Sequence, residues 1–151
     1  MKILRLLLFL LFFITIQLFE MILNVVFLPF EFQLEIFLVA LVFFGTFFNS
    51  EKFIFPIFLT GLFYDLFFSS FYIGVYSGLY ILILLFVNYA NVKISKRYFQ
   101  KAIVFLLSFI MYNLLDFVEL KTTFFTYGSL VTLLTSFLVF ISLERFVKPN
   151  V

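Results

Sequence analysis

An aspartate in an otherwise apolar stretch is the residue of this chain best placed to do chemistry. Asp65 lies within the segment 61–80, which reads GLFYDLFFSSFYIGVYSGLY. An ionisable side chain at membrane depth is costly, so we expect it to face protein and to serve a function. If the segment is helical, Gly61, Asp65 and Ser69 are spaced four residues apart and share one face.

Small residues on both sides of Asp65 predict a tightly packed pair of helices. After a break at Ser69 and Ser70, Gly74 and Gly78 form a G-x-x-x-G spacing that is typical of closely packed membrane helices. If the two helices form an antiparallel hairpin, their small-residue stripes pack together and shelter the acid from lipid. The same spacing also occurs at dimer interfaces, which is the alternative use.

Two roles for Asp65 follow from this arrangement. The carboxylate is a polar anchor that fixes the hairpin or serves a partner or ligand site. Alternatively, it caps the turn after its own helix or extends toward the outer interface of the membrane. The side chains within reach as hydrogen-bond partners are Ser69, Ser77 and the hydroxyls of Tyr72 and Tyr76.

Asn113 and Asp116 are the next polar pair, three residues apart near the outer end of a later apolar run. They line a polar pocket with Asp65, or they are hydrated near the membrane surface. The acids are scattered and no nucleophile–base pair stands out, so we predict that the chain is not an enzyme.

Smaller polar groups are interpreted as structural. Glu20 and Asn24 are explained by a position at the membrane interface. Ser129, Thr132 and Ser136 form a small polar face that is typical of helix packing.

Composition predicts an integral membrane protein. Hydrophobic residues make up 66% of the 151 residues and charged residues only 12%, whereas soluble domains carry about 25% charge. At about 20 residues per span, six or seven helices fill the chain, so we predict a single membrane domain over residues 1–151. Cys and His are both absent, which excludes disulfides, thiol catalysis and imidazole ligands. We therefore expect no cofactor and no metal.

The apolar runs are continuous rather than alternating, which predicts an all-α bundle of six transmembrane helices. Polar breaks place the spans at about 3–23, 34–48, 53–69, 71–90, 102–118 and 124–143.

The basic residues predict the orientation. Six spans put nine of them on the side of both termini, and only Lys121 on the other; the nine are Lys2, Arg5, Lys52, Lys93, Lys96, Arg97, Lys101, Arg145 and Lys148. The positive-inside rule then makes both termini cytoplasmic. The basic loop 91–101, with Lys93, Lys96, Arg97 and Lys101, either sets this orientation or binds anionic lipid or a cytoplasmic partner.

With these residues in place, the chain resembles the rod shape-determining protein MreD family. The resemblance lies in the length, the short basic N-terminus and the element G-L-x-x-D-L-x-x-S followed by a glycine-led helix. Here the element covers Gly61 to Ser69 and is followed by Ile73-Gly74. Pro29 also stands where that family often has a proline.

The resemblance implies a non-enzymatic subunit of the cell-elongation complex in the bacterial inner membrane. The implied partners are MreC, the MreB filament, RodA and a class B penicillin-binding protein, with no nucleic acid. The implied fold is similar to the S component of energy-coupling-factor transporters, so the alternative function is vitamin binding for transport. The outer loops are short and few polar groups are expected to converge on one outer site, which favours the scaffold.

Overall fold

The structure is a computed structural model that describes residues 2–27, 29, 33–48, 50–69, 72–93, 98–114 and 127–147. Within these residues the chain forms six α-helices and no strand, so the all-α prediction is confirmed. A short 3₁₀ turn, η2 (Ser50–Lys52), precedes the third helix. The helices are α1 (Lys2–Phe27), α2 (Ile36–Phe47), α3 (Ile54–Phe67), α4 (Val75–Lys93), α5 (Tyr98–Tyr112) and α7 (Tyr127–Val147).

Two of the helices are long and apolar enough to cross a membrane, by length and composition. They contain the segments Leu4–Phe27 and Tyr127–Phe146. The other helices are apolar but shorter, and α2, α3 and α5 have 12, 14 and 15 residues. At about 1.5 Å of rise per residue these three extend roughly 18 to 23 Å, which is less than the ~30 Å hydrocarbon core of a bilayer.

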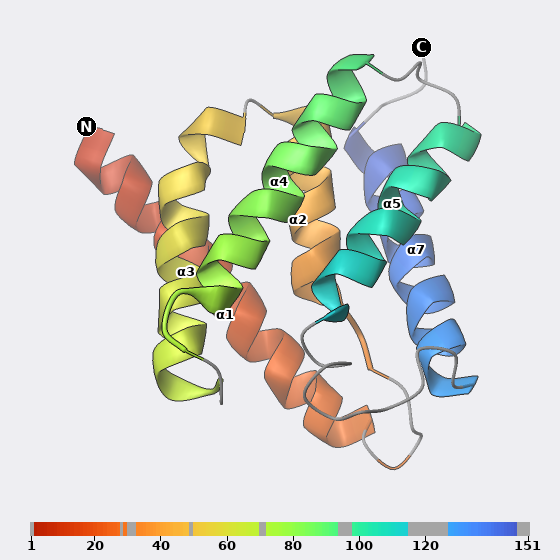
Figure 1. Cartoon of the computed structure of the whole chain (residues 1–151), viewed down its shortest axis with the longest axis horizontal. Coiled ribbons are helices and arrows are strands. Elements are labelled where there is room, and N and C mark those ends of the chain that lie inside the picture. The colour runs from red at the N-terminus through yellow and green to blue at the C-terminus, as the bar shows by residue number, and fades with distance from the viewer. Residues whose placement is uncertain are drawn as a thin grey trace.

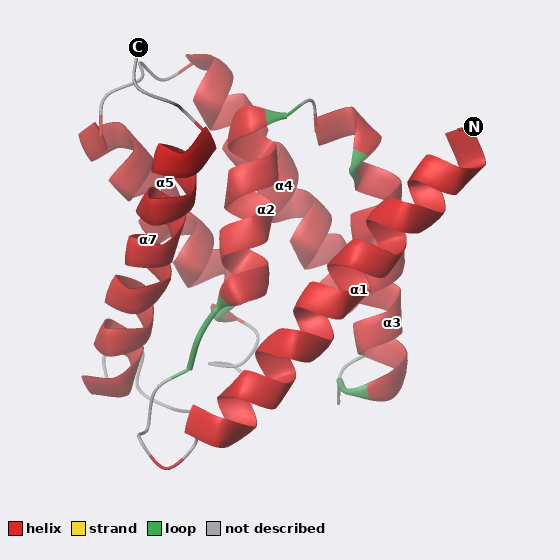
Figure 2. Ribbon diagram, turned by 180° about the vertical axis from the view of Figure 1, so that it is seen from behind, coloured by secondary structure: helices red, strands yellow, loops and turns green. Residues whose placement is uncertain are grey.

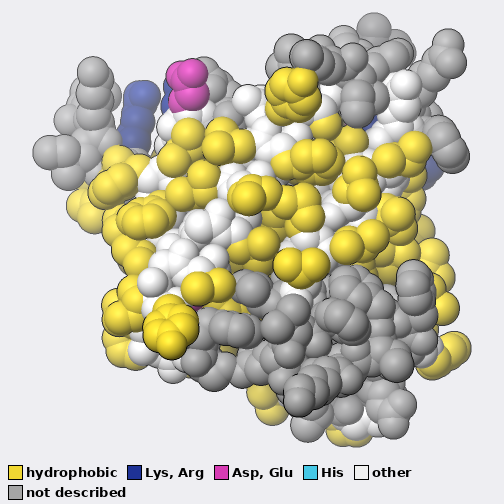
Figure 3. Space-filling view, in the orientation of Figure 1, with side chains coloured by type: hydrophobic (Ala, Val, Ile, Leu, Met, Phe, Trp, Pro, Cys, Tyr) yellow, Lys and Arg dark blue, Asp and Glu magenta, His cyan; other side chains and the backbone are white. Residues whose placement is uncertain are grey.

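The helices alternate in direction, so their ends gather at two opposite ends of the molecule (Figure 1). The start of α1 lies at the same end as the last turns of α2, α4 and α7; we call this the charged end. The basic residues at this end include Arg5, Lys52, Lys101 and Arg145. In the space-filling view, charged side chains lie along this rim, above a mainly hydrophobic surface (Figure 3). We call the opposite end the pocket end.

The short helix α2 lies at the centre of the bundle. It contacts α1, α4, α5 and α7, while α3 packs against α1 and α4. From behind, α1 runs obliquely across the bundle in front of α3 (Figure 2). Every residue of α2 except Thr46 is apolar or glycine, and a helix that is hydrophobic on all sides is a buried helix. Residues 37–42 and Gly45 are indeed buried.

Aromatic side chains fill the core between these helices. Phe13 of α1 is fully buried and contacts the rings of Phe37 and Phe44 of α2 edge-on, with centroids 6.2 and 5.2 Å apart. Phe44 also contacts Phe53, at 4.9 Å, just before α3. Edge-to-face contacts of this kind are favourable for aromatic rings, so the phenylalanine-rich sequence packs α1, α2 and α3 together.

Candidate functional site

Asp65 of α3 caps the first turn of α4. Its carboxylate accepts three backbone hydrogen bonds, from the N–H groups of Gly74 (2.9 Å), Tyr76 (3.0 Å) and Ser77 (3.2 Å). The side chain is only 4% exposed. A helix leaves its first N–H groups without intrahelical partners, and the N-cap side chain normally accepts from the second or third residue. The position before α4 is a glycine without a side chain, so Asp65 supplies the cap from the neighbouring helix.

This geometry differs from the hydrogen bonds expected from the sequence. The sequence predicts side-chain hydroxyls as its partners, but the three hydrogen bonds come from backbone N–H groups. Nor does Asp65 extend toward solvent or cap the turn after its own helix. The distinction matters because the partial positive charge of a helix N-terminus stabilises a carboxylate.

The small residues contribute differently from the expected stripes. A Cβ on Gly61 would lie 2.3 Å from the Cα of Ser77, so the glycine lets the backbones of α3 and α4 meet. Gly74 instead lies just before α4 with a φ of +103°, a left-handed conformation that favours glycine. A Cβ on Gly78 would meet nothing within 4 Å. The predicted G-x-x-x-G packing surface is therefore not what joins the helices: Gly78 makes no close contact with α3, and Gly74 contacts α3 through its N–H bond to Asp65. Ser69 lies two residues beyond the end of α3, so it does not continue the helical face of Gly61 and Asp65 as predicted, and Ser70 lies outside the described residues.

A second buried acid, Glu20, caps the start of α2. Glu20 of α1 is 5% exposed, and one of its carboxylate oxygens accepts the backbone N–H of Phe37, the second residue of α2. Its other oxygen accepts the hydroxyl of Tyr112, at 3.0 Å. The interfacial position expected for Glu20 left out this role as a cap of α2. Glu20 also lies in an apolar run. The cost of placing an acid there, which identified Asp65 as a candidate, therefore applied equally to Glu20.

The backbone leading into α2 is held by side chains of two other helices. Asn24 accepts the N–H of Leu34 at 2.7 Å and donates to its carbonyl at 3.4 Å. From α7, Thr132 accepts the N–H of Gln33 at 2.9 Å and Ser136 accepts that of Glu35 at 3.3 Å. The small polar face of α7 was expected to pack helices, but Thr132 and Ser136 bind backbone. These contacts tie α1 and α7 to the start of the central helix.

These two capped helix starts border a cavity of about 300 Å³ at the pocket end. It is lined by residues of α1, α3, α4 and α5 and of the segment before α2. Its polar lining comprises Gln17, Glu20, Asn24, Gln33, Glu35, Tyr64, Tyr76, Tyr80 and Tyr112. Several polar groups therefore converge on one site, contrary to the expectation from the sequence. Neither Asn113 nor Asp65 lines this cavity.

Four tyrosine rings form a continuous row along the cavity. Tyr64 contacts Tyr76 with ring centroids 4.7 Å apart, Tyr76 contacts Tyr80 at 6.0 Å, and Tyr80 stacks on Tyr112 at 5.8 Å. The row runs from α3 across α4 to α5. It ends at the hydrogen bond from Tyr112 to Glu20. The tyrosines thus connect the helix pair capped by Asp65 with the helix pair capped by Glu20.

Gln17 is a cavity-lining residue with an unsatisfied hydrogen-bond acceptor. Its side chain is 2% exposed and lines the cavity. In the part of the chain that the structure describes, its Oε1 atom is buried without a hydrogen-bond partner. A buried acceptor without a donor is unfavourable, and such groups in native proteins call for an explanation.

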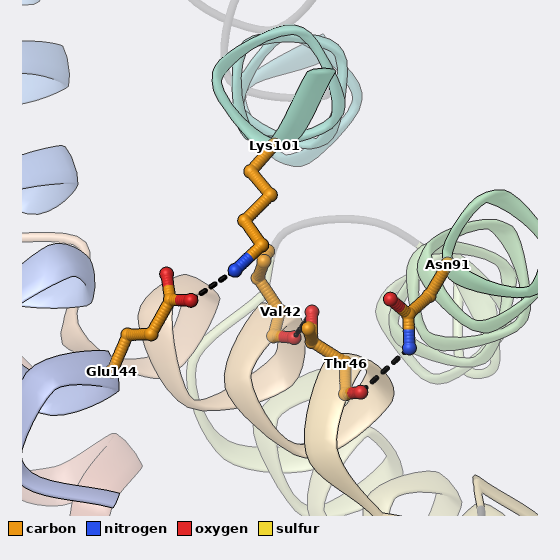
Figure 4. Close-up of polar contacts among 5 residues, drawn as sticks. All are labelled: Val42, Thr46, Asn91, Lys101 and Glu144. Carbon is orange, nitrogen blue, oxygen red and sulfur yellow. Dashed lines mark hydrogen bonds and ion pairs between the residues drawn. The ribbon is translucent and has the colours of Figure 1, made fainter. Parts of the chain in front are cut away.

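At the charged end, an ion pair joins α5 to α7 (Figure 4). Lys101 pairs with Glu144, and the two side chains are 16% and 7% exposed. Nearby, the amide of Asn91 donates to the carbonyl of Thr46 at 2.6 Å and so links α4 to α2. Lys101 was predicted to lie in a basic loop, but it lies within α5 and its ammonium contacts Glu144.

The other predicted polar residues contribute little to this geometry. The amide of Asn113 donates to the carbonyl of Phe109, one turn earlier, at 3.1 Å. Lys93 is the last residue of α4. Asp116, Lys96 and Arg97 lie outside the described residues. Across the described part of the chain, no three His, Cys, Asp or Glu side chains cluster as a metal site would require.

Comparison of the chain with known protein families, with curated proteins and with solved structures finds no match in any of the three. The geometry of the two caps and the cavity therefore carries the functional argument.

Proposed function

We propose that this protein is a non-enzymatic membrane subunit of the bacterial cell-elongation complex, similar to the MreD family. The observation that carries the proposal is the role of Asp65. The element in which the chain resembles that family, Gly61 to Ser69, is the element that joins α3 to α4. Gly61 lets the two backbones meet and Asp65 caps the second helix. The resembling residues are thus the ones that fix the shape of the bundle.

The contacts of the buried acids support binding rather than catalysis. Asp65 and Glu20 each hold the backbone at the start of a helix. Glu144 forms an ion pair with Lys101. Acids that are engaged in this way stabilise one arrangement of helices, as a subunit that presents a fixed surface to other membrane proteins requires. The partners implied by the resemblance are MreC, RodA and a class B penicillin-binding protein.

The charge distribution supports a place in the bacterial inner membrane with both termini in the cytoplasm. Arg5, Lys52, Lys101 and Arg145 all lie at the charged end. The positive-inside rule makes this the cytoplasmic end, with all six helices in the bilayer. The shorter helices α2, α3 and α5 fit a bilayer if it thins locally around them. The basic segment 91–101 then binds the MreB filament or anionic lipid.

The test is co-purification from the cells that produce the protein. A tagged full-length chain is extracted in mild detergent, and the proteins bound to it are identified by mass spectrometry. We expect enrichment of MreC, RodA and a penicillin-binding protein, and a loss of this enrichment in Asp65→Asn. Glu51→Gln, a change at the opposite end, is the matched control. If the unaltered chain enriches none of the elongation proteins, the proposal fails.

The cavity favours a second candidate function. A concave site with several converging polar groups is typical of small-molecule binding, and the S components of energy-coupling-factor transporters bind vitamins for uptake. Under this function, the same co-purification would recover a pair of ATPases and a coupling subunit in place of the elongation proteins.

A further inference from the structure

The side of the bundle formed by α1 and α3 contains two helices of very different length. α3 has 14 residues and extends about 21 Å, whereas the apolar segment of α1, Leu4–Phe27, has 24 residues and extends about 36 Å. The two helices pack against each other. In the proposed membrane location they cross the same layer of hydrocarbon, so the two cannot both match its thickness while standing upright.

Both ends of α3 are marked by groups that are costly among lipid tails. At the charged end, the exposed residues Glu51 and Lys52 of η2 precede the helix. At the pocket end, the backbone leaves the helix at Phe68 and Ser69. Charged side chains and non-helical backbone are both unfavourable in hydrocarbon. The hydrocarbon beside α3 is therefore limited to the height of residues 53–68, at most about 24 Å, whereas a typical bilayer has ~30 Å.

An exposed tyrosine marks the same boundary. Tyr72, in the described part of the connection from α3 to α4, is 89% exposed. Tyrosine is enriched where the hydrocarbon of a bilayer meets the headgroups. Its position after α3 therefore places the membrane surface close to the end of this helix.

The direction of α1 agrees with a thin layer of hydrocarbon. Its apolar side chains are exposed at both ends of the helix, with Leu4 at 64% and Val26 at 60%. The helix crosses α3 obliquely (Figure 2). A membrane helix that is longer than the local hydrocarbon thickness accommodates the difference by tilting. The tilt of α1 and the shortness of α3 thus fit one layer that is thinner than an ordinary bilayer.

The opposite side of the bundle does not share this feature. The apolar segment of α7, Tyr127–Phe146, has 20 residues and extends about 30 Å, the thickness of an ordinary hydrocarbon core. The mismatch is therefore confined to one side of the molecule.

From these observations we infer that the side formed by α1 and α3 binds phospholipids with short acyl chains, which form a locally thinned bilayer around it. The inference rests on the proposed membrane location and is independent of the elongation partners. It adds bilayer thickness to the properties that decide where in a membrane the protein resides.

The test uses the purified full-length protein in phosphatidylcholine vesicles. Dimyristoleoyl, dioleoyl and dierucoyl lipids carry monounsaturated chains that increase in length in this order. Flotation on a density gradient first shows that the chain is bound to the vesicles, and circular dichroism then follows thermal unfolding. We expect the unfolding temperature to be highest in the dimyristoleoyl lipid and lower by about 5 °C or more in the dierucoyl lipid.

A second measurement does not depend on unfolding. The protein is reconstituted in an equal mixture of the dimyristoleoyl and dierucoyl lipids and is then excised with a styrene–maleic acid copolymer. Mass spectrometry counts the lipids that remain around it. We expect the short-chain lipid to be enriched at least about twofold over the bulk mixture.

Matched variants assign the preference to the side of α3. Glu51→Leu combined with Lys52→Leu removes the charges that limit α3 and lengthens its apolar surface. The difference in unfolding temperature between the short-chain and long-chain lipids should then fall by about half or more. Ser142→Leu combined with Arg145→Leu makes the same kind of change on α7, which already matches an ordinary bilayer, and should leave the difference unchanged.

An unfolding temperature that is highest in the dioleoyl or dierucoyl lipid would overturn the inference. So would excised protein whose lipids have the composition of the bulk mixture, or an equal response of the two pairs of variants. A chain that does not float with the vesicles would overturn the membrane location as well. Co-purification that recovers no elongation proteins would remove the first proposed function and leave the lipid preference standing.

Discussion

Replacing Asp65 with alanine tests the cap of α4 directly. The change removes the acceptor of three backbone N–H groups, from Gly74, Tyr76 and Ser77. Tyr76 and Ser77 are buried, so their N–H groups cannot turn to water when the carboxylate is lost. An unsatisfied buried donor costs about 1 to 3 kcal/mol. With two such donors we expect Asp65→Ala to lower the free energy of unfolding by about 3 to 5 kcal/mol.

Asparagine at the same position provides a graded comparison. Its single carbonyl oxygen can take the place of Oδ2, which accepts from Gly74 and Ser77. Its amide group would then face the N–H of Tyr76, and the attraction between a charge and the helix dipole would be lost. We therefore expect Asp65→Asn to cost about 1 to 3 kcal/mol, less than alanine.

The assay is unfolding of the purified protein by sodium dodecyl sulfate in mixed micelles. Far-ultraviolet circular dichroism reports helix content, and it suits a chain that contains no tryptophan. Glu51→Ala, in the exposed turn η2, should stay within about 0.5 kcal/mol of the unaltered protein. If Asp65→Ala stays within 1 kcal/mol of it as well, or if asparagine costs more than alanine, the reasoning from the cap is refuted.

Three further predictions concern other parts of the bundle. Gly61→Ala should lower the free energy of unfolding by at least about 2 kcal/mol, because the new Cβ would overlap the backbone of α4. Gly78→Ala should leave the free energy of unfolding unchanged or raise it by up to about 1 kcal/mol through helix propensity. Lys101→Met should lower the free energy of unfolding by about 2 to 3 kcal/mol, because the buried carboxylate of Glu144 loses its charged partner, and adding Glu144→Leu should recover most of this loss. Both pairs of variants are compared by the same unfolding assay. Tyr72→Cys introduces the single thiol of the chain at the pocket end, and a membrane-impermeant maleimide should label it in intact cells.

Each of these has a result that would contradict it. Equal losses in the two glycine variants would mean that α3 and α4 do not meet at Gly61. A double variant as unstable as Lys101→Met would show that the loss does not come from an unpaired carboxylate. Labelling of the cysteine only after the membrane is permeabilised would reverse the proposed orientation.

The helices were predictable because their apolar runs are continuous and polar breaks separate them. The helix boundaries were less so: the third apolar run was expected to continue to Ser69 and the fourth to begin at 71, yet α3 ends at Phe67 and α4 begins at Val75. A positive φ at Gly74, together with a cap supplied by Asp65, defines where α4 begins. Neither is visible in local hydropathy.

The misinterpreted glycines show the limit of a spacing motif. Gly74 and Gly78 are four apart, but spacing alone does not say which side of a helix faces its neighbour. The structure turns Ser77 toward Gly61 instead.

The cavity was missed for a related reason. Its carboxylates, Glu20 and Glu35, are 15 residues apart, and the tyrosines that complete it come from three helices. Their convergence depends on how α1, α3, α4 and α5 pack around α2. Sequence separation gives no measure of that distance in space, although the burial cost of Glu20 was a usable signal.

The two caps also have a consequence for insertion of the chain into the bilayer that we propose as its location. In each case the acid precedes the helix that it caps, so Glu20 and Asp65 have left the ribosome before the backbone that they bind. The backbone N–H groups that these acids bind, at the starts of α2 and α4, lack these acceptors until the preceding helix lies beside them. An N–H group without an acceptor is costly in hydrocarbon. We therefore expect insertion in consecutive pairs, with α1 receiving α2 and α3 receiving α4 as each emerges.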